Sequence, residues 1–150
     1  MITADQVLEE IRSLLAEKLN AQTVYADVCP KDFARPGYWV ETVKEETDPV
    51  NFCTVRKRMY FSVTCFLPAD TGESGGSTSP TQMQTEVTAL FRSGFLRLGS
   101  RALKVSTDAN GHESDRSIVS LRFEFFDDLT DAEETAPLMG DVDVALKKGD

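Results

Sequence analysis

The chain has 150 residues, of which 41% are hydrophobic and 27% charged, and its formal net charge is -9. This length and composition are typical of one globular domain and exclude a disordered chain of low hydrophobicity. The acidic balance, 25 Asp and Glu against 16 Lys and Arg, argues against tight sequence-independent binding to a nucleic-acid backbone, which depends on many basic contacts.

The cysteines and the N-terminal stretch indicate in which cellular compartment the protein is expected. Cys29, Cys53 and Cys65 occur without a CxxC pair or a His cluster, so we expect neither a disulfide framework nor a zinc site. The N-terminal stretch lacks the basic and apolar regions of a signal peptide, and no apolar run approaches the roughly 20 residues that cross a bilayer. These features predict an intracellular soluble protein.

The first predicted element is a helix that starts after Thr3. Thr3 and Gln6 have the spacing of a capping box, and apolar residues then recur at helical spacing, namely Val7, Leu8, Ile11, Leu14, Leu15 and Leu19. The opposite face is charged but not basic, so we expect this helix to cover a sheet and not to lie on a membrane. A short strand over residues 23–28 should follow.

Residues 38–43 and 55–66 are predicted strands, because β-branched and aromatic residues dominate both and neither contains Gly or Pro. In the second, alternation places Val55, Lys57, Met59, Phe61, Val63 and Cys65 on one face, and Arg56, Arg58, Tyr60, Ser62, Thr64 and Phe66 on the other.

The only tryptophan, Trp39, follows the break Arg35-Pro36-Gly37. Pro36 restricts Arg35 to extended conformations, and Gly37 permits a sharp entry into the strand. Trp39 shares one face with Glu41 and Val43, and Tyr38 shares the other with Val40 and Thr42. We therefore expect this strand to be a core element that is covered on both sides at its start.

Residues 68–81 are rich in Gly and Ser and predict a flexible loop. Ser79 and Gln82 then form a second capping-box pattern with Pro80 at the first helical position, and Met83, Val87, Leu90 and Phe91 form the apolar stripe of a helix that stops near Gly94. A hairpin follows, with strands over 102–106 and 118–126 and a turn at Asn110-Gly111. In its second strand Val119, Leu121, Phe123 and Phe125 should face inward, and Arg122 and Glu124 outward.

Residues 127–137 are an acidic run that should be solvated and mobile, and residues 138–148 then alternate like a strand. We expect that strand to join the edge of its own sheet or to pair with a neighbouring subunit. The pattern as a whole predicts an α+β fold, with an antiparallel or mixed sheet of about five to six strands and two helices packed on one face. Residues 1–128 should form the single domain, and residues 129–150 an acidic mobile segment with a C-terminal strand or arm.

No catalytic residues, metal ligands or cofactor-binding residues are predicted. The only histidine, His112, lies beside the Asn110-Gly111 turn, where a solvated polar residue is expected. The carboxylates occur in runs and not as an isolated pair, and Asp108, Asn110 and Glu113 resemble a calcium loop only weakly. The Gly-rich segment lacks the Gly-Lys-Ser/Thr ending of a phosphate loop.

The only basic cluster is Arg56-Lys57-Arg58, whose side chains alternate between two faces. Two interpretations stand side by side. The cluster pairs with the acidic segment 41–48 of an adjacent strand, which contributes little where it is exposed. Alternatively, Arg56 and Arg58 meet an acidic surface on another subunit and set register and partner choice.

The order of these elements resembles a known family. An amphipathic helix and the short strand "VYADV" lead to "FARPGYWVETV" and then to "RKRMYFSVTCFLP". The pattern is an Arg-Pro break before an aromatic strand with a Glu, then a basic pair, and then an aromatic-hydrophobic-Pro ending, carried by Arg35, Pro36, Tyr38, Trp39, Glu41, Arg56, Arg58, Phe66, Leu67 and Pro68. It resembles the tail terminator proteins of contractile-tailed bacteriophages and phage-like particles. The Gly-Ser loop and the acidic tail depart from that family's usual pattern.

The resemblance implies a structural, non-enzymatic virion protein, made in the host bacterial cytoplasm. It would form a ring, as a homohexamer, at the head-proximal end of the tail tube, stop tube and sheath polymerisation, and offer a surface to the head or neck. Its partners would be itself, the tail tube protein, the sheath and the head-tail connector, with DNA passing without specific binding. The candidate interface residues are Arg35, Glu41, Glu45, Glu46, Arg56, Arg58 and Tyr60. The alternatives are another neck or tail-completion protein, or a small non-catalytic cytoplasmic ligand-binding or regulatory domain.

Overall fold

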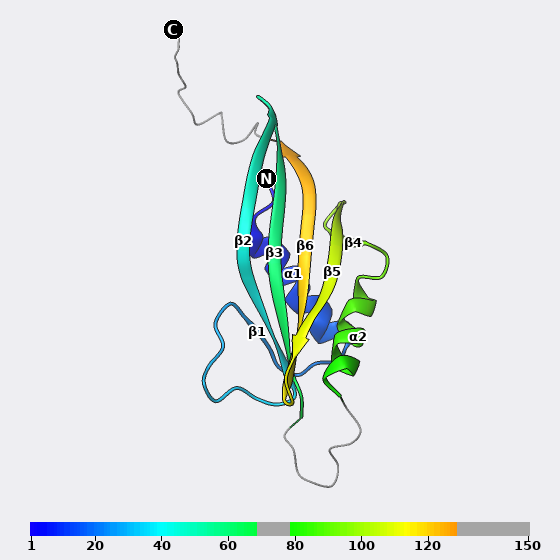
Figure 1. Cartoon of the computed structure of the whole chain (residues 1–150). Coiled ribbons are helices and arrows are strands. Elements are labelled where there is room, and N and C mark those ends of the chain that lie inside the picture. The colour runs from blue at the N-terminus through cyan, green and yellow to red at the C-terminus, as the bar shows by residue number, and fades with distance from the viewer. Residues whose placement is uncertain (69–78, 129–150) are drawn as a thin grey trace.

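The computed structural model describes residues 1–68 and 79–128, which form an α+β fold of two helices and six strands. The helices are α1 (Ala4–Lys18) and α2 (Pro80–Leu90). The strands are β1 (Val24–Ala26), β2 (Gly37–Asn51), β3 (Thr54–Phe66), β4 (Phe95–Leu98), β5 (Arg101–His112) and β6 (Arg116–Asp128). They form one sheet in the order β1-β2-β3-β6-β5-β4 (Figure 1).

The sheet is mixed, because β1 and β2 are parallel while every other neighbouring pair is antiparallel. It curls into a half-barrel, and both helices pack against the same face (Figure 1). The predicted fold class is therefore confirmed. One hydrophobic cluster joins the helices to the sheet, and its most deeply buried side chains include Val7, Ile11, Leu15, Val40, Met59, Phe61, Val63, Val87, Leu103, Val119, Leu121 and Phe123.

Both helices begin where the sequence predicted. The side chain of Thr3 accepts from the backbone N–H of Gln6 at 3.3 Å, and the side chain of Gln6 accepts from the backbone N–H of Thr3 at 2.8 Å, which completes a capping box. Ser79 caps α2 by accepting from the backbone N–H of Gln82 at 3.1 Å. Each cap satisfies backbone donors that the first helical turn leaves without partners.

The strands are longer than predicted in two places. β2 does not end at Val43 but continues through the acidic segment to Asn51, because β3 places basic side chains opposite the carboxylates. Asn110 and Gly111 lie inside β5, next to a register shift between Ala109 and His112, so they mark an irregularity in the strand and not the turn. The chain reverses at residues 113–115.

Two other predictions need correction. β1 covers only three residues of the expected span 23–28, and β4, a short edge strand on β5, was not predicted. Trp39 is half-buried on the face opposite the helices, whereas Tyr38 and Val40 are buried under them, so the start of β2 is helix-covered on one side only.

The remaining predictions on loops and tail lie outside the described residues. These are most of the Gly-Ser loop, at 69–78, and the acidic run and predicted C-terminal strand, within 129–150. Among the described residues, neither helix has the length and apolar content that spanning a membrane requires.

Candidate functional site

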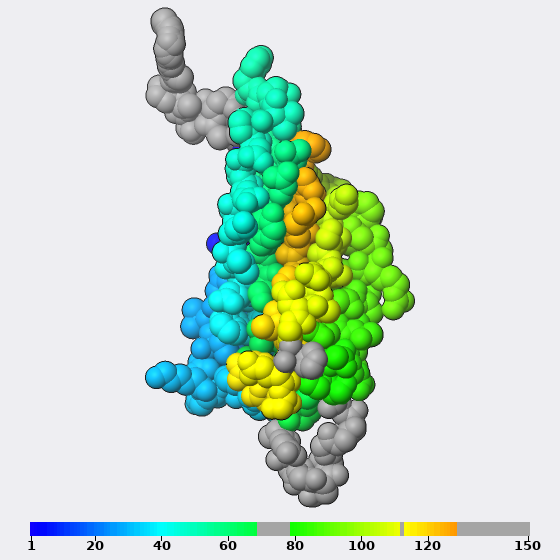
Figure 2. Space-filling view, in the orientation of Figure 1, coloured from blue at the N-terminus to red at the C-terminus, as the bar shows by residue number. Residues whose placement is uncertain are grey.

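The sheet face opposite the helices, called the outer face here, is a broad surface that no helix of the described chain covers. Figure 2 shows β2, β3, β6 and β5 lying side by side on this face. The strand register arranges its side chains in rows. Asp48, Arg56 and Phe126 form one row, and Glu46, Arg58, Glu124 and Lys104 form the next.

The centre of these two rows is a charged ladder, defined as Glu46, Asp48, Arg56, Arg58 and Glu124. Arg58 Nη1 lies 3.0 Å from Asp48 Oδ2 and 3.8 Å from Glu46 Oε1, and its Nε lies 3.5 Å from Glu124 Oε2. Arg56 lies 3.9 Å from both Asp48 and Glu124. The side chains of Arg58 and Glu124 are 25% and 28% exposed, so the middle of the ladder is only partly solvated.

Two further side chains extend the ladder along β2 and β3. Lys44 Nζ lies 3.1 Å from Glu46 Oε2, and the hydroxyl of Tyr60 donates to Glu46 Oε1 at 3.3 Å. The hydrogen bond from Lys44 is the largest influence that holds the pKa of Glu46 below its ordinary value, with Tyr60 and Arg58 acting in the same direction. Glu46 is therefore ionised at neutral pH, and the ladder is a fixed pattern of alternating charge.

The structure brings together five of the seven predicted interface residues on the outer face. Glu46, Arg56, Arg58 and Tyr60 contact one another through the ladder, and Glu41 lies farther down the same face opposite Ser62. Of the two interpretations of the basic cluster, pairing with the adjacent acidic strand is thus observed. Whether the same residues also meet another subunit stays a prediction.

Glu45 lies on the other face. A register shift between Thr42 and Lys44 inserts Val43 as an extra residue, so that Glu45 pairs with Met59 on the helix side and Glu46 pairs with Arg58 on the outer side. Glu45 contacts Lys57 there, at 3.7 Å. A bulge exchanges the faces of all the residues that follow it, and the alternation of the sequence contains no signal for its position.

Arg35 lies at the opposite end of the sheet from the ladder. Its guanidinium sits over the rings of Phe33 and Phe66, which stack with centroids 4.0 Å apart. Its Nη2 is 2.8 Å from Asp115 Oδ2, and its Nη1 donates to the Asp115 carbonyl at 3.0 Å. Arg35 therefore fastens the loop before β2 to the turn between β5 and β6, which is a structural contact.

Large exposed apolar side chains lie at the tip of the β2–β3 hairpin and on the outer face. Phe52, at the tip of the β2–β3 hairpin, is 95% exposed, and Val50 beside it is 52% exposed. On the outer face Phe95 and Phe126 are 54% and 56% exposed. Phe126 pairs with Arg56 of the ladder, and Phe95 pairs with Lys104 of the second row. Exposed apolar side chains beside charged ones favour a protein-binding surface over a purely solvated one.

A second polar cluster, which the sequence did not reveal, lies on the helix side and holds the start of the chain. The backbone N–H of Ile2 donates to Asp127 Oδ2 at 2.7 Å, and Lys57 Nζ donates to the carbonyl of Ile2 at 3.0 Å. Lys57, Asp127 and Ile2 are all buried, and we call them the N-terminal clamp. Arg101 adds an ion pair to Asp127 at 3.2 Å.

The described residues contain few side chains that could bind a metal ion or act in catalysis. No three His, Cys, Asp or Glu side chains there are close enough to hold a metal ion. All three cysteines are free, and burial raises the pKa of the Cys65 thiol to about 12. His112 is the last residue of β5, next to the chain reversal at residues 113–115. That its side chain is solvated stays a prediction.

Comparison with known proteins adds no assignment: no protein-family model matches the chain, and no curated protein has a significantly similar sequence.

Proposed function

We propose that this chain is a structural subunit that assembles into a ring and acts as a tail terminator. In this role it caps the head-proximal end of a phage tail tube, ends tube and sheath polymerisation, and offers its free side to the head-tail connector. The proposal joins the family resemblance of the β2–β3 region to a surface suited to protein contacts. It assigns the chain a binding role and no catalytic step.

The observation that carries the proposal is the β2–β3 hairpin. Both strands run past the helices, and the hairpin ends in the exposed pair Val50 and Phe52 (Figure 1). A monomer gains nothing from leaving Phe52 95% exposed, because burying such a side chain is worth roughly 1.5–3 kcal/mol. Contact with another protein would recover that free energy.

A closed ring needs two unlike surfaces on each subunit, since every subunit meets one neighbour on each side. The chain offers such a pair. One is the edge of β2 beyond Val40, which has no strand neighbour among the described residues because β1 pairs only with Tyr38–Val40. The other is the edge formed by β4, at the opposite end of the strand order.

The charge of the chain fits a channel that passes DNA. A net charge of -9 repels a phosphate backbone, and the basic side chains of the ladder are already paired with carboxylates. Such a subunit would surround DNA without retaining it.

Native mass spectrometry and electron microscopy of the purified protein test the ring. We expect a discrete oligomer with cyclic symmetry. Phe52→Ser should shift the population toward monomer, whereas the control Val28→Ser, at another exposed position, should leave it unchanged. A strictly monomeric wild-type protein at high concentration would count against the ring.

A second experiment tests the terminator role itself. Purified chain added to a polymerising tail tube protein should give shorter tubes with density at one end. An oligomer that leaves tube length unchanged and instead binds the isolated connector would support a neck protein. A protein that binds neither would support the small regulatory domain.

A further inference from the structure

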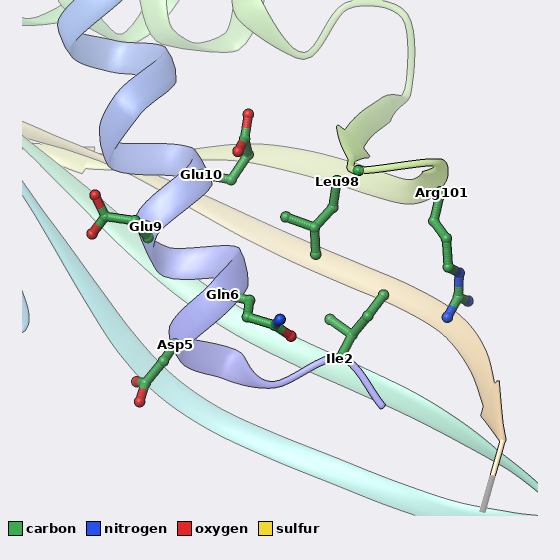
Figure 3. Close-up of a pocket in the computed structure, with 8 residues that line it drawn as sticks. Ile2, Asp5, Gln6, Glu9, Glu10, Leu98 and Arg101 are labelled. Carbon is green, nitrogen blue, oxygen red and sulfur yellow. The ribbon is translucent and has the colours of Figure 1, made fainter. Parts of the chain in front are cut away.

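An open groove lies between the first turns of α1 and the β4–β5 turn. It is lined by Ile2, Asp5, Gln6, Glu9, Glu10, Leu98, Gly99 and Arg101 and has a volume of about 570 Å³. In Figure 3, Ile2 and Leu98 are the apolar side chains of the lining, Gln6 projects from α1 toward Ile2, and the Glu10 carboxylate points away from Leu98. A cavity of about 150 Å³ already holds a benzene ring, so the groove has room for a large aliphatic side chain and its neighbours.

The walls of the groove are negatively charged. Among the described residues neither Asp5 nor Glu10 has an ion-pair partner, while Glu9 pairs with Arg12. The one basic residue in the lining, Arg101, is engaged with Asp127 at 3.2 Å. The groove therefore suits a segment in which an aliphatic side chain is followed directly by positive charge.

The chain itself contains such a segment. Leu146-Lys147-Lys148 is an aliphatic residue followed by two lysines, and these are the only basic residues after Arg122. We propose that Leu146-Lys147-Lys148 docks in this groove of its own chain. Leu146 packs on Ile2 and Leu98, and the two lysines lie against Asp5 and Glu10.

The position of the groove favours this occupant. The described chain ends at Asp128, and Asp127 contacts two residues of the lining, Ile2 and Arg101. About 18 residues separate Asp128 from Leu146, so a flexible linker would give a root-mean-square reach of roughly 21–25 Å. The tethered segment therefore has an effective concentration on the order of millimolar, and a weak intrinsic affinity is enough to fill the groove.

The negative charge of the groove favours binding of the two lysines over the acidic residues of the tail. Asp131, Glu133 and Glu134 lie nearer to Asp128 in the chain but would be repelled by Asp5 and Glu10. The proposal concerns a single chain and does not depend on ring formation, so it can fail while the ring stands.

Disulfide trapping in the full chain tests the docking. In a background of Cys29→Ser and Cys53→Ser, the pair Gln6→Cys with Ala145→Cys places one thiol in the groove and one beside Leu146. The control pair uses Ser13→Cys, an exposed position two turns farther along α1, about 10.5 Å away. If the tail docks in the groove, the Gln6→Cys pair should form its disulfide at least several-fold faster than the Ser13→Cys pair, and the disulfide should lie within one chain.

Two results would overturn the proposal. Equal rates for the Gln6 and Ser13 pairs would mean that the tail does not prefer the groove. A disulfide that links two chains on a denaturing gel would mean that the tail of another copy fills it.

Charge reversal tests the role of the lysines. Lys147→Glu with Lys148→Glu should slow closure of the Gln6 pair several-fold, and adding Asp5→Lys with Glu10→Lys should restore it. Asp5, Gln6, Ser13 and Cys53 are exposed, and Glu10 and Cys29 are partly exposed. Trp39 fluorescence verifies that each variant is folded. If these charge reversals left the rate of disulfide formation unchanged, the proposed pairing of Lys147 and Lys148 with Asp5 and Glu10 would be refuted.

Discussion

The N-terminal clamp leads to a prediction about the free energy of unfolding. Replacing Asp127 with Asn keeps the shape of the side chain but removes its charge. In the native protein this carboxylate accepts from the Ile2 N–H at 2.7 Å, from the Asp128 N–H at 3.1 Å and from Arg101 at 3.2 Å. Asp127→Asn therefore weakens three charge-assisted hydrogen bonds at a site that is 7% exposed.

The magnitude follows from these contacts. A hydrogen bond to a charged group contributes about 1.5–3 kcal/mol, but the amide of Asn still accepts one of them, and Arg101 is 40% exposed and partly screened. We expect the free energy of unfolding to fall by about 1.5–2.5 kcal/mol at neutral pH. For a chain of this size that corresponds to a decrease of roughly 3–10 °C in Tm.

The effect should depend on pH. Burial is the largest single influence and raises the pKa of Asp127, but the hydrogen bonds from Ile2 and Asp128 and the nearby positive charges together hold that pKa below its ordinary value of 3.8. A carboxyl with a depressed folded-state pKa stabilises the fold above its unfolded-state pKa, and that stabilisation is lost as the pH falls through the folded-state value. The difference between wild type and Asp127→Asn should thus be constant from pH 7 to about 5 and shrink below pH 4.

Urea unfolding followed by the fluorescence of the only tryptophan, Trp39, measures this difference at each pH. The matched control is Asp128→Asn, at the exposed neighbouring position, which should change the free energy of unfolding by less than about 0.5 kcal/mol. A cost for Asp127→Asn no greater than that of the control, or a cost that does not decrease at low pH, would refute the role assigned to the clamp.

Three further predictions concern other parts of the molecule. Gln84→Met removes donors to the carbonyls of Asn110 and Ile118, at 3.1 and 2.8 Å, and should lower the free energy of unfolding by about 1–3 kcal/mol in urea, whereas the exposed Gln82→Met should not. Arg58→Met, which breaks several ladder contacts, should cost more than Arg122→Met, and the gap should narrow in 1 M salt; a salt-independent gap would contradict the ladder. Cys53 should react with a thiol reagent in the folded protein, while Cys65, fully buried and with its pKa raised to about 12, should react only on unfolding.

The parts of the fold that local sequence determines were predictable. The caps at Thr3 and Ser79 are hydrogen bonds between residues three apart, so their spacing appears directly in the sequence. The two faces of β3 follow from alternation, which the burial of its side chains reproduces from Val55 to Val63, whereas Thr64, Cys65 and Phe66 are all buried. These predictions needed no knowledge of what lies across the sheet.

The parts that depend on distant residues were not predictable. The ends of β2 and the bulge at Val43 are determined by pairing with β3. The clamp joins Ile2 to Asp127, 125 positions apart. The burial of Gln84 depends on carbonyls of β5 and β6. In the last two cases a polar residue that looks solvated in the sequence, Asp127 or Gln84, is buried because its hydrogen-bond partner is distant in the chain.

The ladder changes what the ring proposal requires of its interface. Because Arg56 and Arg58 already contact Glu46, Asp48 and Glu124, a neighbouring subunit that used them would have to break or share existing ion pairs. Exposed ion pairs of this kind contribute about 0.2–1 kcal/mol each, so exchanging one set for another yields little affinity. The ladder can therefore specify which orientation of a partner is tolerated, while the free energy of association must come from apolar side chains such as Phe52, Phe95 and Phe126. On this account, reversing the charge of Arg58 would alter the symmetry or salt dependence of assembly, whereas Phe52→Ser would shift the population toward monomer.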